Sequence, residues 1–89
     1  MATKEQNLES LNNAMSTLNQ IATNPSTPRN IRKNIAELIE GLKSDKYSIS
    51  VRAVNTISLL DDVTQDPNLP SYVRTPLWQA VSTLESIRE

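Results

Sequence analysis

The sequence predicts an all-α protein, namely an up-and-down antiparallel four-helix bundle built from two helical hairpins. Apolar residues recur at steps of three and four along four segments, as they do on one face of an α-helix. The chain also has a single Gly and only three aromatic residues, which suits helices packed through aliphatic side chains. Short connections between neighbouring helices make them antiparallel, and a closed bundle buries all four apolar faces at once.

An internal repeat pairs the four helices into two hairpins. Self-similarity at a fixed period marks a repeated structural unit. We therefore expect one domain over residues 1–89, with hairpins at residues 3–43 and 48–88. Two-helix units of this length also resemble HEAT repeats, but two of them would leave both ends of a solenoid uncapped. A shift of 42 residues lays Asn24, Pro25, Pro28, Ile31 and Arg32 onto Asp66, Pro67, Pro70, Val73 and Arg74.

The first predicted helix begins after Thr3 and ends before Pro25. Thr3 and Gln6 have the spacing of a capping box, in which each side chain bonds the other residue's backbone N–H. Asn24 ends the helix because a residue before proline is pushed out of the α region. The apolar stripe consists of Leu8, Leu11, Ala14, Met15, Leu18, Ile21 and Ala22.

The second predicted helix has Thr27 as its cap and Pro28 at its first position. Proline is tolerated there because the first backbone N–H of a helix has no partner within it. The helix is expected to end near Gly41, Ser44 and Asp45, because these residue types are typical of turns. The apolar stripe consists of Ile31, Ile35, Leu38, Ile39 and Leu42.

The third predicted helix is capped by Ser48 or Ser50. Val51, Val54 and Leu59 spread apolar surface beyond its main stripe, so we expect it to be the most buried of the four helices. The main stripe consists of Ile49, Ala53, Ile57, Leu60 and Val63.

The fourth predicted helix contains a proline. Pro76 has no N–H to donate to the carbonyl of Tyr72, which predicts a bend. The alternative is a short turn from Pro70, with the helix proper starting near Pro76. The apolar stripe consists of Val73, Leu77, Ala80, Val81, Leu84 and Ile87.

Composition narrows the chemistry open to the chain. Without Cys or His it has no disulfide, no thiol nucleophile, and neither the commonest general base nor the commonest transition-metal ligand. No apolar run is long enough to span a bilayer, so we expect a cytoplasmic protein without a membrane anchor. The net charge of −1 argues against a general nucleic-acid binder. We expect no enzymatic activity, no cofactor and no metal.

Charged residues oppose the helix dipoles at the end where both proline turns should meet. Three basic residues begin the second helix and three acidic residues end the third. We expect ion pairs between the two sets, with Arg32 reaching Asp62; the alternative is an open site for a phosphate or carboxylate. The basic residues are Arg29, Arg32 and Lys33, with Arg74 at the second turn, and the acidic ones are Asp61, Asp62 and Asp66.

Trp78 lies about 120° around the fourth helix from its apolar stripe, and Ala36 holds the equivalent place in the first repeat. One interpretation is a residue packed over a neighbouring helix. The other is an anchor for another protein or for a second copy of the chain, because Trp is enriched at such contacts.

Residues 18–42 and 51–85 together resemble the archaeal uncharacterised protein family 0147. The most specific part is DPNLP followed by an arginine, Pro70 and Arg74 being four residues apart. The resemblance implies a short all-helical protein with a four-helix bundle of bromodomain-like topology. It brings no assigned activity, so it identifies no functional residue. Pro76 departs from the family pattern, which has an ordinary helix-forming residue there.

These features favour a small non-enzymatic interaction or adaptor protein that binds an unknown protein partner. The alternative is association with RNA through the basic residues of the turn end, and a self-associating structural protein is a third hypothesis. The candidate interaction residues are Arg29, Arg32, Lys33, Arg74 and Trp78.

Overall fold

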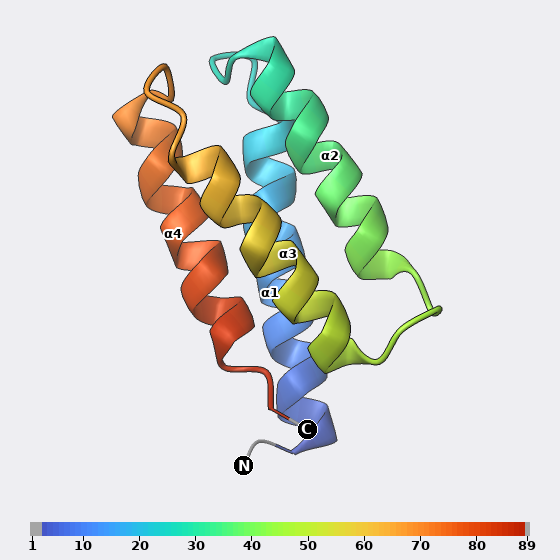
Figure 1. Ribbon diagram of the computed structural model, residues 1–89. Coiled ribbons are helices and arrows are strands. Elements are labelled where there is room, and N and C mark those ends of the chain that lie inside the picture. The colour runs from blue at the N-terminus through green and yellow to red at the C-terminus, as the bar shows by residue number, and fades with distance from the viewer. Residues whose placement is uncertain (1–2, 89) are drawn as a thin grey trace.

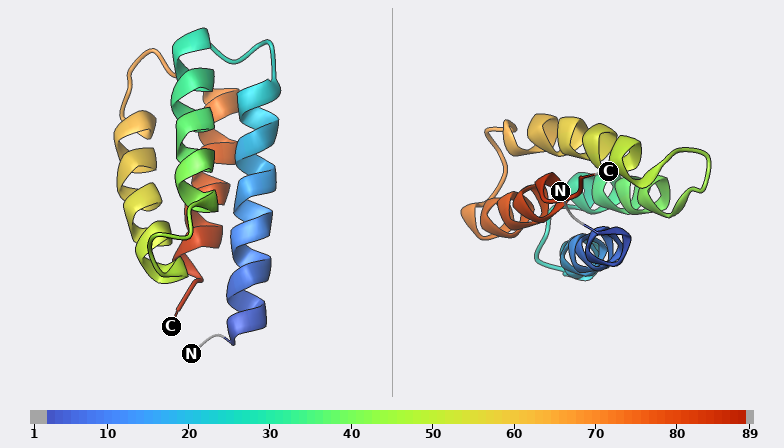
Figure 2. Two further views of the ribbon diagram at one scale, coloured as in Figure 1. Left: turned by 90° about the vertical axis from the view of Figure 1, so that its right-hand side faces the viewer. Right: turned by 90° about the horizontal axis from the view of Figure 1, so that it is seen from below.

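The computed structural model describes residues 3–88, which form four α-helices and no strand. The helices are α1 (Lys4–Thr23), α2 (Arg29–Lys43), α3 (Ile49–Thr64) and α4 (Ser71–Glu85). Each helix runs antiparallel to the next, and α1 packs most extensively against α4, which closes the bundle (Figure 1). Along the bundle axis, α1 and α3 lie on opposite faces with α2 and α4 between them (Figure 2). The predicted four-helix bundle is confirmed.

The core consists of aliphatic side chains contributed by all four helices. The apolar stripes of α1, α2 and α4 face it almost throughout, as their spacing predicts. The prediction is wrong for one residue of the α1 stripe. Leu8 is 44% exposed, because Asn7 takes the inward position at the start of α1. The largest fully buried side chains are Leu18, Ile35, Leu42, Leu60, Leu77 and Leu84.

Asn7 joins the two ends of the chain. Its side chain is 3% exposed, and its Nδ2 donates to the carbonyl of Arg88 over 2.7 Å. The backbone N–H of Arg88 donates in return to the Asn7 Oδ1 over 3.0 Å. The segment after α4 is thereby held against the start of α1, and Ile87 is buried there.

The three connections between helices share one hydrogen-bond pattern. After each helix, a side-chain oxygen accepts from the backbone N–H two residues on, as in an Asx turn. The acceptor is the first residue after α1 and α2 and the second residue after α3. No described residue of these turns has a positive φ, so the chain reverses without a left-handed residue. The acceptors and donors are Asn24 Oδ1 and Ser26 (2.9 Å), Ser44 Oγ and Lys46 (3.3 Å), and Asp66 Oδ1 and Asn68 (2.9 Å).

The start of α2 differs from its prediction by one residue. Pro28 is the cap residue, and its carbonyl accepts from the N–H of Arg32 over 3.0 Å. Thr27 is buried, and its N–H closes the preceding turn by donating to the Asn24 carbonyl over 3.0 Å. Thr27 therefore fills space beneath the turn and does not cap the helix. The caps predicted for α1 and α3 are confirmed, since Thr3 forms its capping box and Ser48 accepts from the N–H of Val51.

The prediction that α3 is the most buried helix is wrong. It has the fewest buried residues of the four helices. Two of its three inward positions hold the small or polar side chains Ala53 and Thr56, whereas the larger Val51, Val54 and Leu59 are exposed. The extra apolar residues of this helix therefore lie on the surface.

Pro76 lies inside an uninterrupted helix. α4 begins at Ser71 and continues past Pro76, so the alternative in which the helix starts near Pro76 is wrong. The carbonyl of Tyr72 has no N–H to accept from at this position. Flanking turns hold the helix together, since Leu77 and Val73 on either side of the proline are buried in the core.

Replacing Asn7 by Ala removes both hydrogen bonds to Arg88. We expect a loss of about 1 to 3 kcal/mol in the free energy of unfolding, because two part-buried backbone groups and the core position of Asn7 lose their hydrogen bonds. Urea denaturation measures it. Asn12→Ala, at an exposed position of the same helix, is the control and should change stability by no more than about 0.5 kcal/mol. Equal effects of the two substitutions would contradict a role for Asn7 in closing the bundle.

Replacing Pro76 by Ala gives α4 its missing hydrogen bond to the Tyr72 carbonyl. We expect a gain of about 1 to 2 kcal/mol, since the proline costs the helix about 3 and stiffens the unfolded chain by up to about 1. Thermal unfolding followed by circular dichroism measures the gain. Pro67→Ala, in a turn outside any helix, restores no hydrogen bond and should raise no melting temperature.

Candidate functional site

The two proline turns lie side by side at one end of the bundle (Figure 1). The hydroxyl of Tyr72, at the start of α4, donates to the carbonyl of Ser26 in the first turn over 2.5 Å. Beneath them is a hollow of about 130 Å³ lined in part by Thr27, whose buried hydroxyl has no hydrogen-bond partner. The prediction that both turns meet at one end is confirmed.

An arginine occupies the fourth position of α2, α3 and α4. Arg52 donates from Nη1 to the Leu42 carbonyl at the end of α2 over 2.9 Å. Arg74 donates from Nη2 to the carbonyl of Asp66, just after α3, over 3.3 Å. Both guanidinium groups therefore lie where the preceding helix ends, which is where its dipole favours positive charge. The Nε atoms of Arg32, Arg52 and Arg74 are all buried without a hydrogen-bond partner.

The expected ion pair between Arg32 and Asp62 is not found within residues 3–88. Asp62 lies on the side of α3 that faces Asn34 and Glu37 of α2. Positions 32 and 34 of a helix are about 200° apart, so Arg32 faces away from that side. The prediction is wrong because it considered which ends of the helices meet, but not which faces of the helices point toward each other.

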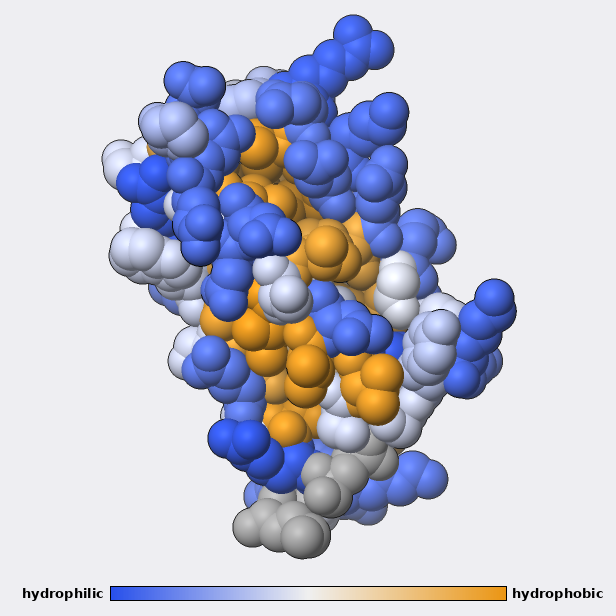
Figure 3. Space-filling model, in the orientation of Figure 1, coloured by the Kyte–Doolittle hydropathy of each residue, from blue (hydrophilic) through white to orange (hydrophobic). Residues whose placement is uncertain are grey.

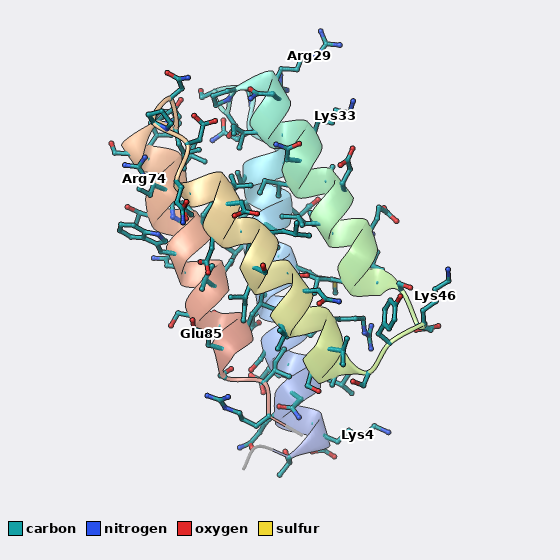
Figure 4. All side chains as sticks on the ribbon, viewed as in Figure 1. Lys4, Arg29, Lys33, Lys46, Arg74 and Glu85 are labelled. Atoms are coloured by element: carbon teal, nitrogen blue, oxygen red, sulfur yellow. The ribbon has the colours of Figure 1, made fainter. Side chains whose placement is uncertain are left out.

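The four basic candidate residues do not form one patch. Arg29 and Lys33 are exposed and project outward from the start of α2, whereas Arg74 lies on α4 (Figure 4). α2 and α4 are the diagonal pair of the bundle that does not pack together. Arg32 is half-buried. The structure thus separates the residues that the sequence grouped at this end.

Trp78 is 58% exposed, so the interpretation of a residue packed over a neighbouring helix is wrong. Arg74 precedes it by four residues and shares its face of α4. Ala36, its counterpart in α2, is exposed as well. Of the five candidates, Arg74 and Trp78 share one face of α4, and Arg29 and Lys33 share one face of α2.

The sequence analysis missed an apolar surface along α3. Val51, Val54 and Leu59 are exposed there, and Figure 3 shows apolar residues in a band down the face where α3 lies. Tyr47, in the turn before α3, adds a further exposed ring. The signal was present in the spread of apolar residues around α3, but it was interpreted as deeper burial.

Neither a metal centre nor a membrane span emerges from the described chain. Within residues 3–88, the acidic side chains nowhere gather in a group of three that could hold a metal ion. None of the helices in this range has an apolar stretch that could cross a bilayer.

Comparisons with known proteins give a single family and no activity. The family model described as "Uncharacterised protein family (UPF0147)" matches residues 1–87. A UPF0147 protein of Aeropyrum pernix is 45% identical over 76 residues, 85% of this chain and 84% of that protein. One of Metallosphaera sedula is 39% identical over the full length of both chains.

Two solved structures have the same fold. One, described as a protein of unknown function, has a TM-score of 0.89 at 35% identity and covers 99% of this chain and 100% of its own. A UPF0147 protein of Thermoplasma acidophilum has a TM-score of 0.87 at 27% identity, with 94% and 99% covered. The matches run along nearly the whole chain in sequence and in structure alike, and the chain therefore belongs to the uncharacterised protein family UPF0147.

Proposed function

We propose that the protein is a small non-enzymatic interaction module that binds another protein through the face of α4 bearing Trp78. The observation that carries the proposal is the exposure of an indole on an ordered helix. Tryptophan is strongly buried on average, and it is the residue most often found to dominate binding at protein interfaces. An exposed indole held by a helix also loses little conformational entropy on binding.

Arg74 supports the same surface. Its hydrogen bond to the Asp66 carbonyl fixes the guanidinium one helical turn from Trp78. Arginine and tryptophan are both enriched at the centres of interfaces. The spread of the basic residues over α2 and α4 favours a protein partner over RNA, whose phosphates need neutralising along one surface.

Capture of a partner from the native cell by the full-length chain tests the proposal. We expect a specific protein, identified by mass spectrometry, to be retained by the wild type and lost with Trp78→Ala. Tyr47→Ala is the control, because Tyr47 is equally exposed, at 58%, but lies in the turn between α2 and α3.

Fluorescence of the single Trp gives a second readout in the same samples. Iodide should quench Trp78 in the free protein, and binding of the captured partner should protect it. A partner retained equally by Trp78→Ala, or no partner at native abundance, would contradict the proposal. Retention of RNA that weakens as salt rises would favour the alternative instead.

A further inference from the structure

A groove runs along the surface between α2 and α3, which pack less extensively than the other helix pairs that are neighbours around the bundle. It contains two hollows of about 320 and 220 Å³. Both are lined by Glu37, Leu38 and Leu59, so they adjoin each other, and we call them together the α2–α3 groove. The larger hollow reaches toward the proline turns at Asp62, and the smaller one toward the opposite end at Tyr47.

The lining of the α2–α3 groove is largely aliphatic. Leu38, only 8% exposed, lies at its floor, and Leu59, 50% exposed, borders both hollows. Val63 follows Leu59 by four residues and lines the larger hollow from the same face of α3. The exposed ring of Tyr47 lies at the end of the smaller hollow. An open groove with apolar walls between two packed helices is a shape into which a third helix fits.

Gly41 leaves room in the wall of the smaller hollow. A Cβ added to it would meet no atom within 4 Å. Glycine inside a helix costs about 0.5 to 1 kcal/mol relative to alanine. No described residue has a positive φ, so the backbone does not require glycine at this position. The missing side chain lets an occupant of the groove lie directly against the backbone of α2.

Thr56 places an unused hydrogen-bonding group in the smaller hollow. It is 4% exposed and lines that hollow from α3. The other threonines within the four helices donate their hydroxyls to a carbonyl three or four residues before them. The hydroxyl of Thr56 forms no hydrogen bond within residues 3–88. Because buried polar groups are almost always hydrogen-bonded, this hydroxyl points to a polar partner that comes from outside the chain.

Two carboxylates border the larger hollow. Glu37 of α2 and Asp62 of α3 are exposed, and neither forms an ion pair in the described part of the chain. Lys33 lies one turn before Glu37 but projects away from the bundle (Figure 4). Arg52 lines only the smaller hollow, where its guanidinium is bonded to the Leu42 carbonyl. The larger hollow is therefore complementary to an occupant with positive charge beside an apolar side chain.

We propose that the α2–α3 groove binds an amphipathic helix of another protein, one that carries large apolar side chains and a lysine or arginine on the same face. Asn34 in the larger hollow and Gly41 in the smaller one are seven residues apart, or about two turns. Two apolar side chains at that spacing on the partner helix fill the two hollows, as in other helix-in-groove complexes. The basic side chain lies between Glu37 and Asp62.

The length of the α2–α3 groove limits the affinity. A contact over about three turns of one helix is smaller than a standard interface of about 800 Å² per partner. We therefore expect dissociation in the micromolar range. Trp78 lines neither hollow, so this inference does not rest on the proposed function.

A model peptide tests the inference by NMR of the full chain. The probe is a synthetic helix of about five turns made of leucine, lysine and alanine, with the leucines and lysines on one face. The matched peptide has glutamate in place of lysine. The chain has one Gly and one Trp, so the Gly41 amide and the Trp78 indole report on the groove and on α4 separately. The lysine peptide should shift the Gly41 signal and leave the Trp78 signal in place, and it should bind at least about tenfold more tightly than the glutamate peptide.

Matched charge variants separate the groove from the net charge of the protein. Glu37→Gln combined with Asp62→Asn should abolish the preference for the lysine peptide, because it removes both carboxylates from the larger hollow. Glu40→Gln combined with Asp61→Asn is the control. It changes the net charge equally at exposed positions that line neither hollow, and it should keep the preference.

Filling the smaller hollow separates binding from folding. Gly41→Leu should raise the melting temperature, because leucine favours the helix, and weaken binding of the lysine peptide at least about tenfold by calorimetry. An unmoved Gly41 signal in the wild type, or equal binding of the two peptides, would overturn the proposal. A shift of the Trp78 indole without one at Gly41 would also overturn it while leaving the proposed function standing. Loss of Trp78-dependent capture contradicts only the proposed function.

Discussion

The fold depends on how the chain reverses between helices. All three turns begin with a side-chain oxygen that accepts from the backbone two residues on, and each next helix carries an arginine at its fourth position. For Arg52 and Arg74, the guanidinium reaches back to a carbonyl at the end of the preceding helix. The turn sets the direction of the new helix, and the arginine ties that helix to the one before. Asn7 holds the same position in α1, and it ties the first helix to the last through Arg88.

This arrangement secures the ends of the helices more firmly than it fills the space between them. α1 packs more extensively against its neighbours than α3 does, and α3, on the opposite face, has Ala53 and Thr56 at inward positions. Small side chains there let the bundle close, and larger ones at Val54 and Leu59 are left in water. The Trp78 face, to which we assign an interaction, is one of the places where large apolar groups remain uncovered.

The all-helical bundle, the meeting of the proline turns and most core residues could be predicted because apolar periodicity and turn chemistry are local properties of a sequence. The roles of Asn7 and Arg52 could not, since their partners are backbone groups, which carry no sequence signal. An Ile-Arg or Val-Arg pair follows all three turns in the sequence, but the internal repeat pointed only to the pairs that follow the two proline turns. The prediction for α3 failed because apolar content does not say which residues face inward. The prediction of ion pairs at the turn end was wrong because it did not consider which faces of α2 and α3 point toward each other.

The arginine after each turn is held against the protein, while the other two arginines are not. The chain has five arginines, and exchange of their Nε protons with solvent can be followed individually by NMR. The Nε atoms of Arg32, Arg52 and Arg74 are buried, whereas Arg29 and Arg88 are exposed side chains that serve as internal controls. We expect slow exchange at the first three and fast exchange at the last two. Fast exchange at all five would show that the arginines after the turns are not held against the protein.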